Sequence, residues 1–309
     1  AKIEGDPLRF PGDWEVVFER AKTPDRALKS KTGKGFQLRT FEDAYDGRPV
    51  TYLLSLPSGY SKGDDLYPVI LALKGPLGLG GRDLEDKVTE MAEAMYGDML
   101  DDAIVLIPIG FAEGSGRKAE ATELEGSWLT EDGLYALFTS MRVLLEQVSY
   151  DRSRLIVDGW GDGGGDALRL ASRAPYWFAG VISRSGPVGA DGDVLYANLE
   201  SIPVSYVNVA ADAAGADLGP LTAIGATVLE ESGSAFAPSD ETKTALATWC
   251  REQEKDLAPE QLDFLIDDII YQSCYWLKAA RINRRATATP SDADFPLFKG
   301  RVDRGRNKI

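Results

Sequence analysis

The chain has 309 residues, of which 44% are hydrophobic, and its formal net charge at pH 7 is −15. This length and apolar content suffice for one large α/β domain or two smaller ones. The acidity disfavours binding to nucleic-acid phosphates or to an anionic membrane surface, and no apolar run approaches the roughly 20 residues of a membrane helix.

Apolar runs typical of buried strands alternate with segments of helical spacing along most of the chain. The expected strands are 51–57, 67–73, 103–108, 155–157, 180–183, 204–209 and 226–230. The expected helices are 84–99, 131–148, 166–173 and 241–254. This alternation, with strands buried on both faces, predicts an α/β protein with a doubly wound, mostly parallel sheet. The stretch 110–126 is rich in Gly, Glu and Ala and is expected to be a loop over the carboxyl edge of the sheet.

Changes in composition divide the chain into three parts. Residues 1–40 are charged and irregular, with a short amphipathic piece at 14–20, and are predicted to form an N-terminal arm. Residues 41–257 carry the α/β pattern. Residues 258–309 are predicted to form a β-rich, basic C-terminal extension. Its charge contrasts with the acidic body, so we expect its tail to dock on an acidic neighbour or to fold back on its own domain.

The two cysteines, Cys250 and Cys274, are too few for a disulfide framework or a thiolate metal site. Whether they bridge each other stays open at this stage. We expect no metal and no cofactor. We expect no signal peptide within this sequence. It starts Ala-Lys-Ile-Glu without a methionine, which keeps a secreted origin open.

The segment 154–164 is an apolar strand that runs into a glycine-rich turn, Gly-Trp-Gly-Asp-Gly, followed by a helix. This is the layout of a nucleophile elbow, Gly-x-Ser-x-Gly, in which a strained turn lifts a serine above the sheet. The serine position holds Gly161, which has no side chain. The chain also contains no histidine, the usual general base of such a site. The residues therefore predict an esterase scaffold without esterase chemistry.

Between residues 48 and 255 the chain resembles the secreted esterase group of the α/β-hydrolase superfamily, the branch of feruloyl esterases and polyhydroxybutyrate depolymerases. The segments that carry the resemblance are 52–60, 67–75, 150–159 with the elbow after it, 174–186 and 202–212. The resemblance implies an α/β-hydrolase fold and a periplasmic or extracellular location, with a cytoplasmic location still open.

The functional residues of that family carry over poorly. The nucleophile position is Gly161, and the residue whose amide would line the oxyanion hole is Asp162, where a carboxylate would oppose a developing oxyanion. The histidine of the oxyanion loop is replaced by Lys74. The acid of the triad falls on Asp212, and the base falls near Ser234. We expect Lys74 to form an ion pair with Asp162 or Asp212 that fills the former site.

Our leading hypothesis is therefore a catalytically inactive protein that serves as a structural or binding subunit of a larger assembly. It would meet protein partners through the N-terminal arm or the basic C-terminal tail, and neither nucleic acid nor a transmembrane segment is expected. One alternative is a hydrolase that uses Asp162, Asp212 and Lys74. Another is a module that binds carbohydrate or ester in the old cleft, with Trp160 and Trp128 stacking on the ligand.

The elbow itself admits three further interpretations. A register slip of one residue would make Asp162 a nucleophile, but it would put Trp160 where a small residue is needed. The glycine spacing 159-x-161-x-x-164 matches a dinucleotide-binding fingerprint, although a lone match is weak. Aspartates in and beside the turn suggest a calcium loop, but the EF-hand spacing is absent. They are Asp158, Asp162 and Asp166. Packing alone explains why positions 163 and 164 are glycine, because a helix under the elbow leaves no room for Cβ atoms.

Overall fold

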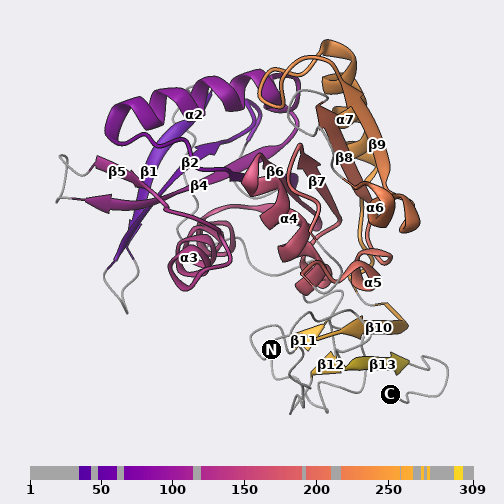
Figure 1. Cartoon of the computed structure of the whole chain (residues 1–309). Coiled ribbons are helices and arrows are strands. Elements are labelled where there is room, and N and C mark those ends of the chain that lie inside the picture. Colours follow the sequence, from indigo (N-terminus) through magenta and orange to yellow (C-terminus); the bar gives the residue numbers. More distant parts are fainter. Residues whose placement is uncertain are drawn as a thin grey trace.

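The computed structural model of the protein describes residues 35–42, 48–60, 66–113, 120–189, 193–209, 217–257, 259–266, 273–274, 277–278 and 296–301. A nine-stranded sheet forms its centre, with helices packed on both faces (Figure 1). Its strands are β1 (Gln37–Glu42), β2 (Pro49–Ser55), β3 (Tyr67–Lys74), β4 (Ile104–Glu113), β5 (Glu120–Glu123), β6 (Tyr150–Trp160), β7 (Gly180–Arg184), β8 (Val204–Val209) and β9 (Thr227–Glu231).

The helices lie mainly in the connections between strands. They are α2 (Gly81–Tyr96), η1 (Gly97–Met99), α3 (Glu131–Gln147), α4 (Asp162–Arg173), η3 (Pro175–Trp177), α5 (Tyr196–Leu199), α6 (Gly219–Ala223) and α7 (Asp240–Glu252). Two of them begin at side-chain caps, where the hydroxyl of Thr130 or Ser239 accepts a hydrogen bond from an amide of the first turn. Such caps satisfy amides that a helix leaves unbonded at its start.

The strand order is β1-β2-β4-β3-β6-β7-β8-β9, with β5 beside β4. Neighbours from β4 through β9 along this order run parallel, whereas β1, β2 and β5 pair antiparallel. The predicted doubly wound, mostly parallel sheet is confirmed. The chain moves from β3 to β4 on one side and returns to β6 on the other, so the strand order reverses between β3 and β6. Ligand sites of open α/β sheets lie at the carboxyl ends of the strands at such a point, here at Lys74 and Trp160, which face each other in the register.

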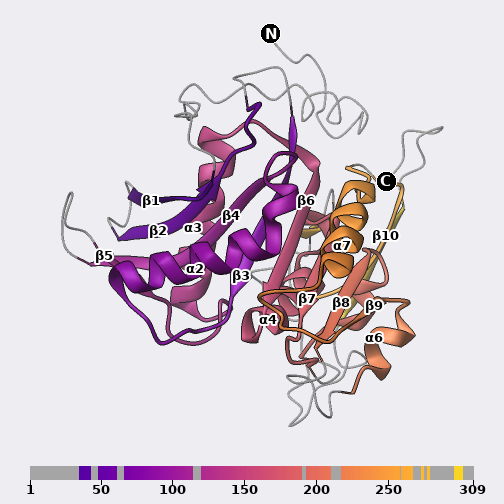
Figure 2. The ribbon, with the colours of Figure 1, turned by 90° about the horizontal axis from the view of Figure 1, so that it is seen from above.

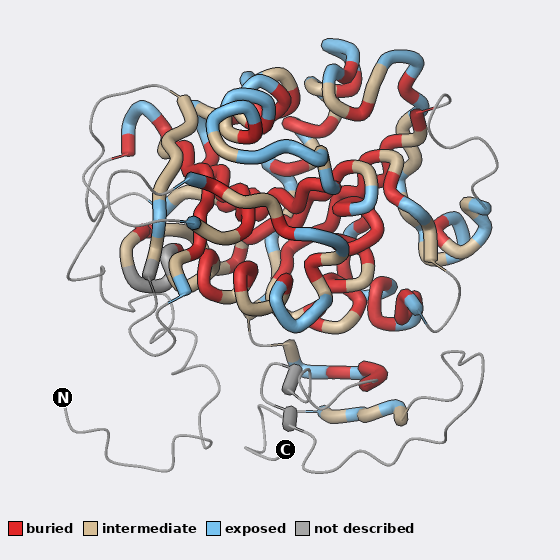
Figure 3. Tube along the Cα trace, turned by 60° about the vertical axis from the view of Figure 1, so that its left-hand side comes forward, coloured by how far each residue is buried: buried red, intermediate tan, exposed pale blue. Residues whose placement is uncertain are grey.

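Two apolar cores lie on the two faces of the sheet. α2 and α7 cover one face (Figure 2), and α3 and α4 cover the other. Successive side chains of β6 alternate between them: Ile156 and Trp160 enter the α2/α7 core, and Leu155 and Val157 enter the α3/α4 core. The buried residues accordingly concentrate in the sheet and on the inner sides of the helices (Figure 3).

Several predicted elements are recovered, but with shifted ends. The strand at 204–209 coincides with β8, whereas the strand predicted at 155–157 extends over the whole of β6. The loop predicted at 110–126 is wrong, because β4 continues through Glu113 and β5 returns antiparallel beside it. Only Ala121 of β5 is buried, so this strand lacks the alternation that would mark it in the sequence.

The C-terminal extension contains short antiparallel strand pairs. β10 (Gln261–Leu265) pairs with β13 (Leu297–Arg301), and β11 (Ser273–Cys274) pairs with β12 (Leu277–Lys278). Asn198 of α5 attaches β10 to the body, because its amide donates to the Leu265 carbonyl at 2.9 Å and accepts the Leu265 N–H at 2.7 Å. Cys250 is a buried, free thiol, so it is not bridged to Cys274.

The predicted division at 40/41 falls inside β1, so the sheet already begins at Gln37. Residues 14–20 and most of the basic tail lie outside the described residues. The three-part division of the chain therefore stays a prediction. None of the helices in the described ranges is long and apolar enough to cross a membrane.

A buried ion pair joins β6 and β7 within the α2/α7 core. Asp158 and Arg184 are both fully buried, and Arg184 donates to the Asp158 carboxylate from Nε at 3.0 Å and from Nη2 at 2.7 Å. The hydroxyl of Tyr96, from α2, donates to the same carboxylate at 3.0 Å. Burial raises the pKa of Tyr96 well above its ordinary value, and the neighbouring Asp158 charge raises it further. The phenol therefore stays a donor and ties the helix to the sheet.

Removal of one charge from this pair should be costly, because the other would remain buried without a counter-charge. We expect Asp158→Asn to lower the free energy of unfolding by about 3–5 kcal/mol, measured by urea denaturation. The double variant Asp158→Leu/Arg184→Met removes both charges, so its free energy of unfolding should fall by less than that of the single variant. A loss below about 1 kcal/mol for Asp158→Asn would contradict this account.

Candidate functional site

The turn between β6 and α4 has the backbone of a nucleophile elbow. Its apex, Gly161, has φ 58° and ψ −134°, a conformation that L-residues rarely adopt. The apex is fixed by hydrogen bonds from its N–H to the Arg184 carbonyl at 3.1 Å and from the Gly164 N–H to its carbonyl at 2.9 Å. Apart from Gly161 and its two chain neighbours, no described residue has an atom within 4 Å of a Cβ built at this position. The position that would project a nucleophile is therefore open but carries no side chain.

The glycines around the apex allow strands and helix to touch. A Cβ at Gly159 would lie 2.1 Å from the Gly163 oxygen, and one at Gly163 would lie 2.3 Å from the Leu73 oxygen. At Gly164 it would lie 2.8 Å from Ser183 Oγ. The expectation that packing excludes Cβ atoms at 163 and 164 is confirmed. Close packing thus accounts for the glycines at 159 and 164, and the positive φ of the apex accounts for the one at 161, without a dinucleotide.

The loop between β3 and α2, residues 75–80, runs directly against the elbow. In hydrolases of this layout, one N–H of that loop joins the amide after the nucleophile to form the oxyanion hole. Here the Gly75 N–H donates to the Trp160 carbonyl at 3.0 Å. Pro76 has no N–H, and the next amides donate to the carboxylate of Glu123, from Leu77 at 2.8 Å and from Gly78 at 2.8 Å. The amides of Gly75, Leu77 and Gly78 thus all donate hydrogen bonds within the protein.

Lys74 pairs with Glu123 of β5, and not with Asp162 as one of our expectations had it. The other expected partner, Asp212, lies outside the described residues. The Lys74 side chain is 1% exposed and that of Glu123 is 9% exposed. Burial lowers the pKa of Lys74, although the hydrogen bond and charge of Glu123 oppose the shift. Burial raises the pKa of Glu123, but hydrogen bonds from Lys74 and the loop amides outweigh it, so this pKa lies below its ordinary value.

The two tryptophans expected to stack on a ligand are both buried. Trp160 is 1% exposed and lies in the α2/α7 core, because its place in the pleat of β6 turns it away from the elbow surface. Trp128 is also 1% exposed, and its indole N–H donates to the Lys74 carbonyl at 2.8 Å. Neither ring is available to stack on a sugar or ester, so this prediction is wrong.

The three aspartates proposed for a calcium loop do not converge. Asp158 is bound to Arg184 in the core, and Asp162 is exposed as the first residue of α4. Asp166 is buried and accepts hydrogen bonds from the Ser127 hydroxyl and the Trp128 amide, each at 2.7 Å. Across the described ranges, no group of three or more His, Cys, Asp or Glu side chains is arranged to hold a metal ion.

The interpretation that makes Asp162 the nucleophile also fails on the backbone. The left-handed apex of the turn is Gly161, one residue before Asp162. Asp162 itself already lies in the first turn of the helix. The apex of the turn thus coincides with position 161, and its assignment as a former nucleophile position stays a prediction.

The segment after β9, where the catalytic base would lie, is fixed by a buried carboxylate. Glu231 accepts hydrogen bonds from the Gly233 amide at 2.7 Å and from Ser239, through its amide at 2.8 Å and its hydroxyl at 2.9 Å. Burial raises the pKa of Glu231, but these bonds outweigh it and bring the pKa to about 2. Ser234, the approximate base position, is half-buried, and its hydroxyl accepts from the Phe236 amide at 3.1 Å.

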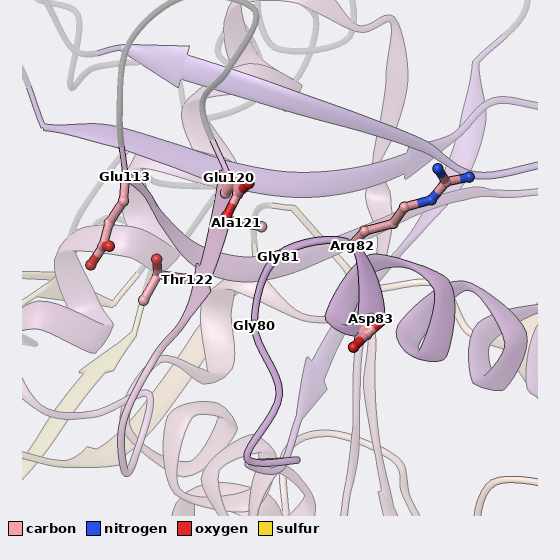
Figure 4. Close-up of a pocket in the computed structure, with 8 residues that line it drawn as sticks. All are labelled: Gly80, Gly81, Arg82, Asp83, Glu113, Glu120, Ala121 and Thr122. Carbon is pink, nitrogen blue, oxygen red and sulfur yellow. The ribbon is translucent and has the colours of Figure 1, made fainter.

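A surface pocket of about 470 Å³ lies between the start of α2 and the β4–β5 hairpin (Figure 4). It is lined by Gly80, Gly81, Arg82, Asp83, Glu113, Glu120, Ala121 and Thr122. Figure 4 shows Arg82 directed away from the hairpin, so its charge does not meet Glu113 across the pocket. The charged side chains that line this pocket thus do not converge on one point where a ligand could bind.

Sequence comparison identifies no relative, since no protein-family model matches the chain and no curated protein matches it. Solved structures do match. A thermostable esterase is similar with a TM-score of 0.53 and 20% identity, over 72% of this chain and 64% of that one. A ferulic acid esterase is similar with a TM-score of 0.47 and 15% identity, over 70% of this chain and 96% of that one. An S-formylglutathione hydrolase from Staphylococcus aureus is similar with a TM-score of 0.48 and 11% identity, over 72% of this chain and 98% of that one.

The likeness to the thermostable esterase, together with the mixed sheet and its flanking helices, establishes an α/β-hydrolase fold. The fold expected from the sequence is confirmed. The chain spans less than two thirds of the length of that esterase. At 20% identity the likeness concerns the fold, and activity must be argued from the site.

Glu123 is the residue that sequence reasoning missed. It lies in a stretch with several other glutamates and was assigned to a loop, so nothing in the sequence singled it out. Only the pairing of β5 with β4 brings it to the β3–α2 loop. Pro76, in contrast, is visible in the sequence, and its missing N–H could have indicated the loss of an oxyanion-hole donor.

The Glu231 carboxylate should make a specific contribution to the pH dependence of stability. Its pKa is about 2 in the folded protein against an ordinary 4.5, so its stabilisation is present above pH 4.5 and is lost as the pH falls toward 2. We expect Glu231→Gln to be less stable than the wild type at pH 7, with a difference that shrinks between pH 4.5 and 2. Urea denaturation at stepped pH measures this.

The exposed neighbour Glu230→Gln provides the matched control and should keep the wild-type pH profile. A Glu231→Gln profile parallel to that of the wild type throughout the acid range would refute the assignment.

Proposed function

We propose that this chain is a catalytically inactive protein of the α/β-hydrolase fold that acts as a structural or binding subunit of a larger assembly. The observation that carries the proposal is Gly161. It has the backbone geometry of an elbow apex and open space above it, but it has no atom that could attack an ester. Covalent catalysis at an elbow needs both a nucleophile and a base, and the chain contains no histidine to act as that base.

The surroundings of the elbow support the same proposal. Stabilisation of an oxyanion requires free donors aimed at the developing charge. The amides of Leu77 and Gly78 donate to Glu123 instead, and Pro76 has no amide hydrogen. Lys74 stands where the related esterases have histidine, and it is bound to the same carboxylate. A substrate carbonyl would therefore find the loop donors already occupied.

The alternative of an unconventional hydrolase lacks comparable support. It needs Lys74 to be accessible, but this side chain is 1% exposed and paired with Glu123. Asp162 is exposed at the start of α4, and no described histidine or lysine pairs with it as a partner base. An inactive protein, in contrast, needs no change in the pairing of Lys74 with Glu123.

The role as a subunit rests on charge and on the extensions of the chain. The body is acidic, whereas residues 281–285 and 299–308 are rich in arginine and lysine. Such a segment is suited to an acidic protein surface. We propose that the partner contacts this tail or the N-terminal arm. We also propose an extracellular or periplasmic location, which rests on the family resemblance.

Hydrolysis of aryl esters by the purified protein tests the first half of the proposal. We expect no turnover of 4-nitrophenyl acetate or of a feruloyl ester above the rate in buffer, because both nucleophile and base are missing. Release of the phenol is followed by absorbance. Turnover that scales with protein concentration and disappears in Asp162→Ala would overturn the proposal.

Gly161→Ser is the matched variant. It puts a hydroxyl into open space, at a cost of about 1–2 kcal/mol for an L-residue in this conformation. We expect it to fold and to remain inactive, because a serine without a base is a weak nucleophile.

The second half of the proposal predicts a partner that depends on charge. Co-purification of the tagged full-length chain from its native cells should yield a stoichiometric protein complex that is weakened by the charge reversals Arg304→Glu and Arg306→Glu. If light scattering shows that the protein purified from its native cells is a monomer without partners, the role as a subunit would be contradicted.

A further inference from the structure

We propose that the β3–α2 loop together with Lys74 forms a binding site for a single carboxylate group, and that Glu123 occupies this site as a ligand supplied by the chain itself. We call this site the carboxylate cradle; it consists of Lys74 and residues 77–79. The inference concerns binding and does not depend on whether the chain is catalytically inactive.

The donors of the cradle converge on the two oxygens of one carboxylate. Oε1 of Glu123 accepts from Lys74 Nζ and from the Leu77 amide at 2.8 Å. Oε2 accepts from the Gly78 amide at 2.8 Å and from the Leu79 amide at 3.4 Å. Three successive amides around one anion form the kind of concave backbone site that binds phosphate or carboxylate groups. The ammonium adds a charge-assisted bond, which is stronger than a neutral one.

The framework of the cradle is held by contacts that do not involve Glu123. The Lys74 carbonyl accepts from the Trp128 indole at 2.8 Å, and the Gly75 amide continues the pairing of β3 with β6. Gly78 has φ +69°, a left-handed conformation that turns its amide toward the same side as its neighbour. The donors should therefore stay in place when the Glu123 side chain is removed, as expected of a preorganised site.

Glu123 reaches the cradle because β5 is fixed beside it. Its backbone pairs with Gly110 in the β4–β5 ladder, and the preceding residue, Thr122, forms a bridge with Gly80 at the end of the loop. A tethered carboxylate has a high effective concentration at its site, so it outcompetes free carboxylates in solution. The wild-type cradle is thus closed, and an external ligand can enter only when Glu123 is removed.

The size and charge of the cradle define the class of ligand. It offers one cationic group and three amides, all directed at a planar group with two oxygens. Formate and acetate match this arrangement, because they present the two oxygens of Glu123 with almost no additional bulk. A neutral amide of the same shape, such as acetamide, has only one acceptor oxygen and no charge.

Chemical rescue of Glu123→Ala tests the proposal. Removal of the side chain leaves the buried Lys74 charge without its counter-charge and the loop amides without their acceptor, so the variant should unfold at a lower temperature than the wild type. Sodium formate or acetate should raise its melting temperature in a saturable way, by about 3 °C at ten times the dissociation constant. Calorimetric titration of the folded variant with formate should give one site per chain.

Controls separate a site from a general effect of salt. The wild type and Glu120→Ala, which removes a glutamate of the same strand outside the cradle, should respond to formate no more than to chloride. Acetamide should leave Glu123→Ala unchanged, and Lys74→Met in the Glu123→Ala background should weaken formate binding at least tenfold. Equal responses of Glu123→Ala to formate and chloride, or no response to either, would overturn the proposal.

A second variant keeps the proposal testable if Glu123→Ala does not fold. Glu123→Gln retains the shape of the side chain but replaces one acceptor oxygen by a donor group. The amide protons of Leu77 and Gly78 should then exchange with solvent at least tenfold faster than in the wild type, as measured by NMR. Unchanged exchange at both positions would show that the carboxylate does not accept hydrogen bonds from these amides, and it would refute the cradle.

Discussion

The architecture around the elbow depends on the direct contact of three backbones, those of β3, β6 and α4. A Cβ at Gly163 would lie 2.3 Å from the carbonyl oxygen of Leu73, and one at Gly159 would overlap the Gly163 carbonyl. Because interiors are packed as tightly as organic crystals, the helix cannot move away without opening a void. The contact therefore forces the chain to turn within one residue, and the positive φ of this turn falls on Gly161.

Charges close to this contact are paired inside the protein. Lys74 is bound to Glu123, Asp158 to Arg184, and Asp166 to the Ser127–Trp128 segment. Each of these groups is buried, and a buried charge is tolerated only when it is paired or hydrogen-bonded. The buried polar groups around the elbow are therefore held in contacts within the protein.

The same fold thus accommodates two opposite uses of one loop. In an enzyme, the amides after β3 must stay free until charge develops on a substrate. In this chain they already bind the carboxylate of Glu123, which links β5 to the β3–α2 loop. A carboxylate supplied by the chain itself stabilises the resting protein, whereas an oxyanion hole must keep its donors free for the substrate.

The sequence by itself determined the features that depend on local residue type. The runs at 67–73 and 204–209 marked buried strands, and the glycines at 163 and 164 marked close packing. Gly161 and the absence of histidine led to the proposal that the chain is catalytically inactive. Only the tertiary structure decided the partners of the charged and aromatic residues. The pleat of β6 sends Trp160 into the core, and the return of β5 beside β4 brings Glu123, 49 residues away in the chain, to Lys74. Side-chain pairing across strands follows from register and strand order, and neither is written in the local pattern of residues.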